Sequence, residues 1–140
     1  MKRFVYILGI IILVGVLIVS FVVIKVYNKP HKDVASATPE YVISVKDLAD
    51  DFHSNEKKAN KKYLDKVVQI EGDIIAISTN NGKTILTLGQ KGSTTEIICT
   101  LDASQNKKVF TLNKGQTITV KGICTGFLMD VMLVRAIIIN

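Results

Sequence analysis

The chain has 140 residues, of which 48% are hydrophobic, 21% are charged and only two are prolines. This composition excludes a disordered chain, a collagen-like chain, a small disulfide-dense domain and a large multidomain enzyme. The formal net charge is +6, but five of the 18 basic residues and none of the 12 acidic residues lie before position 33. From residue 33 onward the net charge is therefore only +1. A basic, nucleic-acid-binding domain needs its charge in the domain itself, so the total charge is no argument for one.

Residues 4–24 form an uncharged apolar run, FVYILGIIILVGVLIVSFVVI. A helix of this length spans roughly 30 Å, the thickness of the hydrocarbon core of a bilayer. We therefore expect residues 1–27 to form a transmembrane anchor with its flanks. A cleaved signal peptide is the alternative, because Ala35-Ser36-Ala37 has the form of a cleavage site. That site lies far beyond the apolar run, however, and the run is longer than an ordinary signal-peptide core.

The orientation of this anchor is not decided by flanking charge, because Lys2 and Arg3 stand before the run while Lys25, Lys29 and Lys32 follow it. A short tail before a long apolar run is typical of a signal anchor with a cytoplasmic N-terminus. We therefore expect a single-pass membrane protein whose C-terminal domain is extracytoplasmic. Residues 28–43 contain both prolines and no apolar period, which predicts a linker.

Residues 44–63 have a helical period that is interrupted near Ser54-Asn55. Ser44 is a good N-cap, and Asp47 follows it by three residues as in a weak capping box. The apolar stripe of this amphipathic segment begins with Val45, Leu48, Ala49 and Phe52.

The period changes to that of strands from Lys66 onward. Expected strands cover residues 66–74, 84–88, 96–101, 116–124 and 131–139, and a short helix or coil covers residues 103–112. Five strands with a helical interlude between the third and the fourth follow the order of an OB-fold. We therefore predict a mainly β chain, in which a five-stranded OB-fold barrel within residues 44–140 follows the transmembrane and amphipathic helices. Gly72 and Gly122 are expected at strand bends, and an open antiparallel sheet packed on the helix is the alternative.

Four short runs carry a resemblance to a known family: NEKKANKKY at residues 55–63, VVQIEGDI at 67–74, KGQTITVKG at 114–122 and DVML at 130–133. Over residues 45–140 the chain resembles the tRNA-anticodon-binding-like OB-fold family of bacterial membrane-anchored proteins. The resemblance implies a fold similar to that of nucleic-acid-binding OB domains. It implies neither tRNA binding nor any catalytic residue.

Cys99 and Cys124 are the two cysteines of the chain. In an extracytoplasmic domain they could form a disulfide between the third and fourth strands, or both could be buried free thiols. A metal site is not expected, because the cysteine spacing is wrong and neither His31 nor His53 is near them in sequence. No cofactor is expected.

Two loops correspond to those that flank the binding face of an OB-fold. Their candidate ligand- or partner-contacting residues are Asn80, Asn81, Lys83, Phe127, Leu128 and Met129. The apolar residues of the second loop either cap the end of the barrel or contact a partner. A candidate basic patch consists of Lys57, Lys58, Lys61, Lys62 and Lys66. These lysines either contact anionic lipid or a polyanion, or form a solvated helix face.

No nucleophile elbow, phosphate-binding loop or HExxH motif occurs in the sequence, so we do not expect an enzyme. The folded part has few aromatic residues with which to stack nucleic-acid bases, which disfavours nucleic acid as a partner. The expected function is a membrane-anchored, extracytoplasmic OB-fold binding or adaptor module, whose partner is an envelope protein or a small ligand. The alternative is a nucleic-acid-binding OB domain tethered at the cytoplasmic face of the membrane.

Overall fold

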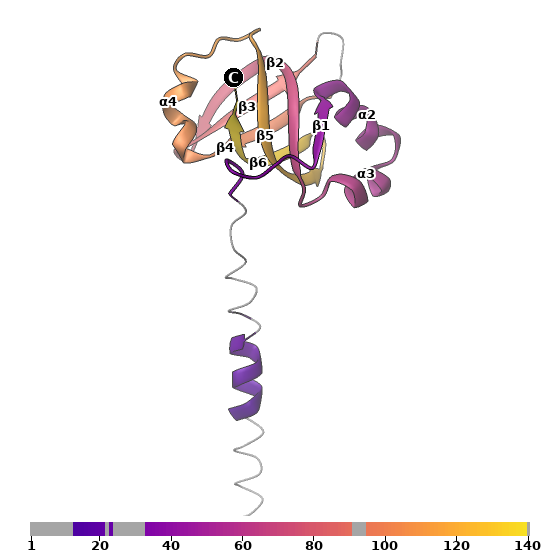
Figure 1. Ribbon diagram of the computed structural model, residues 1–140, viewed down its shortest axis with the longest axis vertical. Coiled ribbons are helices and arrows are strands. Elements are labelled where there is room, and N and C mark those ends of the chain that lie inside the picture. The colour runs from indigo at the N-terminus through magenta and orange to yellow at the C-terminus, as the bar shows by residue number, and fades with distance from the viewer. Residues whose placement is uncertain (1–12, 22, 24–32, 91–94, 140) are drawn as a thin grey trace, which may run out of the picture. The chain divides into compact units, whose positions relative to one another are not determined.

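The computed structural model describes residues 13–21, 23, 33–90 and 95–139. The chain divides into two compact units, residues 1–32 and residues 33–140. In the first unit, residues 13–21 and 23 are helical (Figure 1). The remainder of the membrane-spanning helix expected at residues 4–24 lies outside the described residues. Within the described part of the chain, no helix is both long enough and apolar enough to cross a bilayer.

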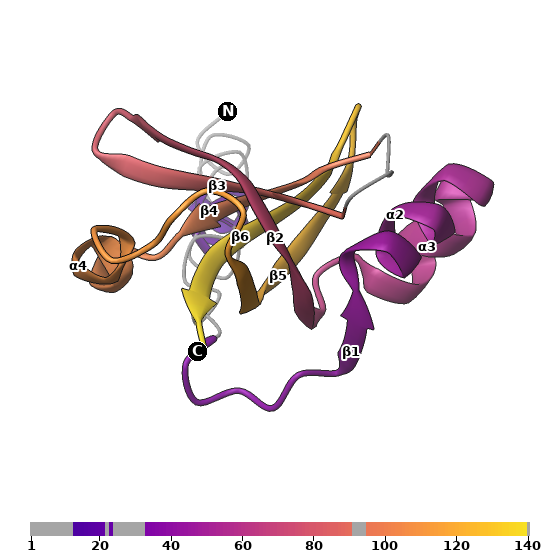
Figure 2. The ribbon, with the colours of Figure 1, turned by 90° about the horizontal axis from the view of Figure 1, so that it is seen from above.

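The second unit consists mainly of one six-stranded sheet. Its elements are β1 (Tyr41–Ser44), α2 (Val45–Ser54), α3 (Glu56–Tyr63), β2 (Val67–Asn80), β3 (Lys83–Gly89), β4 (Ile97–Leu101), the 3-10 turn η1 (Ala103–Gln105), α4 (Asn106–Val109), β5 (Thr117–Phe127) and β6 (Val131–Ile138). The strands follow the order β1-β2-β3-β4-β6-β5, and a further pairing of β2 with β5 closes β2 to β6 into a barrel. Helices α2 and α3 lie on one side of this barrel and α4 lies on the other (Figures 1 and 2).

Strand pairing within the barrel is antiparallel except between β4 and β6, which are parallel. The chain can make this parallel pair because η1, α4 and β5 lie between the two strands in the sequence. This is the topology of an OB-fold, and it confirms the predicted five-stranded barrel over the open sheet. Closure also removes the sheet edges that an open sheet would expose among these five strands.

The bends of the strands lie partly where the sequence predicted them. At Gly122 the register between β5 and β6 shifts, as expected. In β2 the shift lies between Ile74 and Ala76 rather than at Gly72. Gly72 serves a different purpose, because a Cβ atom there would lie 2.4 Å from Cγ2 of Val45. The missing side chain lets the first residue of α2 pack directly on β2.

The core lies inside the barrel and is filled by alternate residues of its strands. In β2 the inward side chains are Val68, Ile70 and Ile74, which have 0% exposure and confirm the predicted strand face. Leu86 of β3 and Leu133 of β6 are equally inaccessible. The interior is therefore occupied by the chain's own aliphatic side chains.

The predicted helical segment is two helices, because Asn55 has an extended backbone (φ −162°, ψ 89°) and ends α2 while it begins α3. Its side-chain oxygen accepts a hydrogen bond from the backbone N–H of Lys58 at 2.9 Å. Ser44 caps α2 as predicted, since its hydroxyl oxygen accepts from the backbone N–H of Asp47 at 3.0 Å.

The stretch predicted as a linker, residues 28–43, is not irregular throughout. Strand β1 begins at Tyr41 and pairs in parallel with β2, a pairing too short to show a period in the sequence. The preceding residues 33–40, here called the N-terminal strap, are also attached to the barrel. Lys121 is only 8% exposed, and its Nζ donates hydrogen bonds to the carbonyl oxygens of Ala35 at 3.2 Å and Ala37 at 2.7 Å. The folded domain therefore includes residues that the sequence assigned to a linker.

Candidate binding face

The outer surface of β3, β4 and β6 is the part of the barrel that lies between the two predicted loops. We define the binding face as its six half-buried side chains, Ile85, Thr87, Ile98, Thr100, Met132 and Val134. The register sets Ile85 opposite Thr100 and Thr87 opposite Ile98, and Ile98 opposite Met132. None of the six is charged or aromatic. This face therefore offers aliphatic carbon and hydroxyl groups rather than charges or stacking rings.

The turn between β2 and β3 lies at one end of the binding face. Asn81 (φ 49°) and Gly82 (φ 74°) both have left-handed backbones, and Asn80 pairs with Lys83 across the turn. Two consecutive left-handed residues form the tight hairpin turn that an Asn-Gly pair predicts. The candidate loop residues Asn80, Asn81 and Lys83 thus lie together at one exposed hairpin tip.

A pocket of about 310 Å³ lies beside this hairpin tip, and its lining includes Lys83, Thr100, Asp102 and Arg135. Arg135 has a left-handed backbone (φ 51°) at the bulge where the register of β4 and β6 shifts. The backbone N–H of Ser104, 2.9 Å from Oδ1, and the charge of Arg135 lower the pKa of Asp102. The pocket thus combines two cations with one ionised carboxylate. Arg135 was not among the candidate site residues of the sequence analysis. The feature that could have identified it is that it is the one charged residue of the last strand.

The loop between β5 and β6 lies at the opposite end of the binding face, and its three apolar residues have separate environments. The ring of Phe127 stacks on Phe52 of α2, with ring centroids 5.8 Å apart, and meets the ring of His53 edge-on at 5.6 Å. Leu128 and Met129 are 82% and 86% exposed. One residue therefore packs against the helix, while the other two project into solvent beside the binding face.

Tyr63 joins the two helices to the barrel. Its side chain has 0% exposure, and its hydroxyl donates to Oδ2 of Asp51 at 2.6 Å. Lys62 forms an ion pair with the same oxygen at 3.1 Å and lies over the Tyr63 ring, 4.6 Å from its centroid. Burial and the hydrogen bond to Asp51 raise the pKa of Tyr63, and the bonds from Tyr63 and Lys62 lower the pKa of Asp51.

Residues 55–63, the first of the four runs that resemble the family, pack α3 against the barrel. Asn55 caps α3, Ala59 is 2% exposed, and the side-chain oxygen of Asn60 lies in a buried position against Gly126 of β5. At Gly126 the backbone has φ of 111°, and a Cβ atom there would lie 3.4 Å from that oxygen. The run therefore holds α3 against the barrel.

The candidate basic patch is divided by its ion pairs. Lys62 pairs with Asp51, and Lys66 pairs with Glu40 of the N-terminal strap at 2.8 Å. Lys57, Lys58 and Lys61 are exposed on α3. These five lysines do not present five equivalent charges on one surface.

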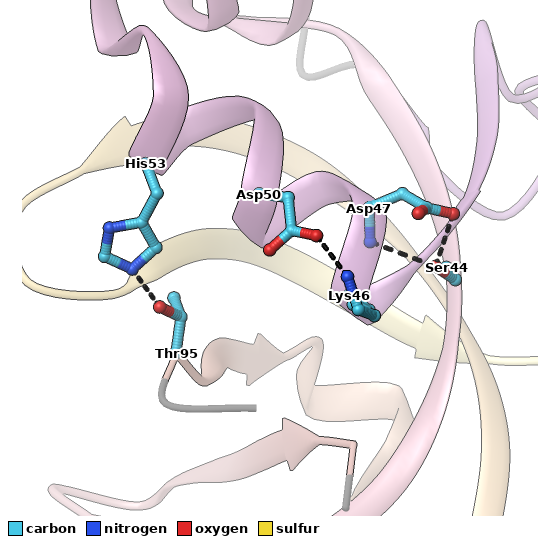
Figure 3. Close-up of polar contacts among 6 residues, drawn as sticks. All are labelled: Ser44, Lys46, Asp47, Asp50, His53 and Thr95. Carbon is cyan, nitrogen blue, oxygen red and sulfur yellow. Dashed lines mark hydrogen bonds and ion pairs between the residues drawn. The ribbon is translucent and has the colours of Figure 1, made fainter. Parts of the chain in front are cut away.

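Figure 3 shows polar contacts of α2, including the Ser44 cap and two further pairs. His53 contacts the hydroxyl of Thr95, which is 3% exposed, and Lys46 pairs with Asp50 one helical turn away. These contacts position the helix. Among the described residues, no group of three or more His, Cys, Asp or Glu side chains could hold a metal ion.

Cys99 and Cys124 are buried free thiols, the second of the two alternatives that the sequence left open. Both pair with Leu133, Cys99 from one side of β6 and Cys124 from the other. Two strand spacings of about 4.8 Å separate their backbones. Because a disulfide requires Cα atoms closer than about 7 Å, β6 prevents the bridge that was the first alternative.

The family model tRNA_anti-like matches residues 1–138. No curated protein matches the chain. Among solved structures, a "putative nucleic acid-binding lipoprotein" of Klebsiella pneumoniae is similar with a TM-score of 0.64 and 22% identity, over 80% of this chain and 100% of that one. A chain of the S. pombe Stn1-Ten1 complex has a TM-score of 0.43 and 25% identity, over 53% of this chain and 58% of that one. A "putative aspartyl-tRNA synthetase" of Leishmania major has a TM-score of 0.46 and 12% identity, over 81% of this chain and 22% of that one.

Proposed function

Because this chain belongs to the tRNA_anti-like family, we propose that it is a membrane-anchored, extracytoplasmic OB-fold module that binds a partner protein of the cell envelope and catalyses no reaction. The observation that carries the proposal is the uncharged binding face, which ends at the exposed side chains of Leu128 and Met129. Aliphatic surface of this kind is suited to the apolar core of a protein interface.

The membrane anchor of the proposal is the apolar run at residues 4–24, whose length suits a bilayer. Two findings support it. The family match begins at residue 1 and so includes this run. The Klebsiella neighbour is also named as a lipoprotein, which accords with a barrel held at a membrane.

Photo-crosslinking in cells tests the binding face. A photoreactive amino acid in place of Met129, 86% exposed, should give a discrete protein adduct, because this position borders the face. The matched control is the same amino acid in place of Lys57, which is exposed on α3 away from the face. Adding Thr87→Lys should abolish the Met129 adduct by placing a charge on the face. Identical adducts at the two positions, or no discrete adduct at Met129, would contradict the proposal.

A second candidate function, nucleic-acid binding at the cytoplasmic membrane face, is favoured by the pocket that Lys83 and Arg135 line. Two cations beside Thr100 suit a phosphodiester, and the Klebsiella neighbour is named as a nucleic-acid-binding protein. Against it, the binding face has no aromatic platform on which bases could stack.

Topology separates the two candidates. Both native cysteines are buried, so a Lys57→Cys variant provides one exposed thiol for an impermeant maleimide. Labelling in intact spheroplasts supports the extracytoplasmic module. Labelling only after lysis places the domain in the cytoplasm and favours the second candidate. Binding of single-stranded oligonucleotides by the wild type, lost in Lys83→Glu and Arg135→Glu, would then establish it.

A further inference from the structure

Helix α4 and the turn after it form an exposed basic surface on the side of the barrel opposite α2 and α3 (Figures 1 and 2). We call it the basic tip and define it as Lys107, Lys108, Phe110 and Lys114. No acidic residue occurs in the sequence between Asp102 and Asp130. The segment that forms the tip therefore contributes lysines and no carboxylate of its own.

Phe110 lies between Lys108 and Lys114 in the sequence and is 89% exposed, the highest fraction among the described large hydrophobic side chains. Its neighbours Val109 and Leu112 are partly buried and pack against the core. The same short segment thus directs two apolar side chains inward and its largest one into solvent. An exposed aromatic side chain flanked by lysines is the pattern of a surface that meets a membrane interface.

The position of the basic tip relative to the chain's own N-terminal strap points to a bilayer as its partner. Lys108 donates a hydrogen bond to the carbonyl oxygen of Ile138, at the end of β6, at 3.2 Å. The adjacent Ile137 pairs with Lys121 of β5. The Nζ of Lys121 donates hydrogen bonds to the carbonyl oxygens of Ala35 and Ala37 in the strap. The tip therefore contacts the end of β6, and the strap contacts the residue of β5 that is paired with that end. Met129, in contrast, precedes the other end of that strand.

Only eight residues, 25–32, separate the apolar run from the strap in the sequence. Even a fully extended chain of that length reaches no more than about 30 Å. A bilayer that held the run would therefore lie within reach of the end of the domain at which the strap begins.

We propose that the basic tip contacts the anionic headgroups of the bilayer in which residues 4–24 are anchored, with the ring of Phe110 at the interface. The proposal rests on the anchor of the proposed function. Lysine side chains are attracted to the anionic headgroups of a nearby bilayer. Aromatic rings are favoured at the depth of the headgroups. Nucleic acid is disfavoured as the occupant, because a single exposed ring provides no successive platform for bases. The contact would orient the barrel and direct Leu128 and Met129 away from the membrane.

The test uses the full chain in nanodiscs and the variant Phe110→Trp. The wild type has no tryptophan, so this variant has a single indole. Discs contain either phosphatidylcholine alone or phosphatidylcholine with phosphatidylglycerol, and brominated acyl chains serve as the quencher. In the anionic discs we expect a blue-shifted emission and at least twofold quenching. Both effects should be weak in the neutral discs and should be lost when Lys107→Glu and Lys114→Glu are added. The matched control Met129→Trp, at the other end of the barrel, should stay unquenched in both discs.

The outcomes separate this proposal from the one on which it rests. If the chain is extracted from vesicles by alkaline carbonate, the anchor fails and the contact fails with it. If the chain resists extraction but the indole of Phe110→Trp is unquenched in anionic discs, the contact alone is overturned. Quenching by an added oligonucleotide, with none by brominated lipid, would assign the tip to nucleic acid instead. Circular dichroism of each variant verifies the fold, which substitution at so exposed a side chain should leave intact.

Discussion

Phe127, near the end of the fourth barrel strand, stacks on Phe52 of helix α2, with ring planes inclined by 23°. Phe52 in turn lies 6.0 Å from the ring of Tyr63, whose edge contact with Tyr41 measures 5.0 Å between centroids. A continuous row of aromatic rings therefore joins β5, both helices and β1. This row fixes the helices against one end of the barrel, next to the binding face.

We expect Phe127→Ala to lower the free energy of unfolding by about 2 kcal/mol, below the range for a fully buried phenylalanine because Phe127 is half-buried. Urea unfolding followed by circular dichroism measures the change. Leu128→Ala, at a position 82% exposed, is the control and should change stability by less than about 0.5 kcal/mol. Equal effects of the two variants would show that the ring contact does not hold the helices.

The bond between Tyr63 and Asp51 makes stability depend on pH. Since the pKa of Asp51 is lowered in the folded chain, its carboxylate stabilises the fold above the unfolded pKa, about 3.9. That contribution is lost as the pH falls through the lower, folded pKa. Tyr63→Phe should cost about 1 kcal/mol at neutral pH, and Asp51→Asn somewhat less, because Asp51 is 43% exposed.

Denaturant titrations between neutral and acidic pH check this prediction. The difference in stability between wild type and Asp51→Asn should shrink below about pH 4, the unfolded pKa. Lys46→Met removes an exposed pair of the same helix and should shift stability little at any pH. If the wild type remained more stable than Asp51→Asn in acid, the stabilising role of the Asp51 carboxylate would be contradicted.

Gly72 should not tolerate a side chain, since its Cβ would lie 2.4 Å from Cγ2 of Val45 and 3.2 Å from the carbonyl oxygen of Gly89. We expect Gly72→Ala to cost about 1–3 kcal/mol through overpacking. Combining it with Val45→Ala should cost less than the sum of the two single changes. Gly82→Ala is the matched control, because a Cβ atom there would meet no atom within 4 Å. Its cost arises only from the φ of 74°, so adding Val45→Ala should not change that cost.

Lys121→Met should release the N-terminal strap, because the variant keeps the apolar stem but loses both hydrogen bonds to the strap carbonyls. Cleavage after Glu40 by a glutamate-specific protease should become about tenfold faster, corresponding to about 1.4 kcal/mol. Lys57→Met, at an exposed lysine, serves as the control. An unchanged cleavage rate in Lys121→Met would show that Lys121 does not retain the strap.

The thiols of Cys99 and Cys124 should react only when the chain unfolds. Both are buried, and burial raises the pKa of each, which leaves little reactive thiolate at neutral pH. Labelling with a chromogenic disulfide reagent should be slow in buffer and reach two thiols in urea. A mobility that differed between reducing and non-reducing gels would indicate a bridge and contradict the register of β6.

The sequence was most informative where period and backbone chemistry are local. The alternation from Val68 to Ile74 predicted a strand, and the Asn81-Gly82 pair predicted its hairpin. Ser44 predicted the start of a helix. In each case neighbouring residues alone determine the conformation. The strand β1 was missed because four residues are too few to reveal a period, and a parallel partner in β2 is required to hold them.

For this protein, the sequence by itself determined the apolar N-terminal run, the number and order of the barrel strands, and the near-neutral charge of the folded part. Only the tertiary structure decided that Phe127 packs inward while Leu128 and Met129 point out, and that β6 separates the two cysteines. It also brought Arg135 into one pocket with Lys83, and Lys108 of the basic tip against the end of β6. The physical reason is that these relationships depend on the closure of the barrel, which joins strands distant in the chain through their register.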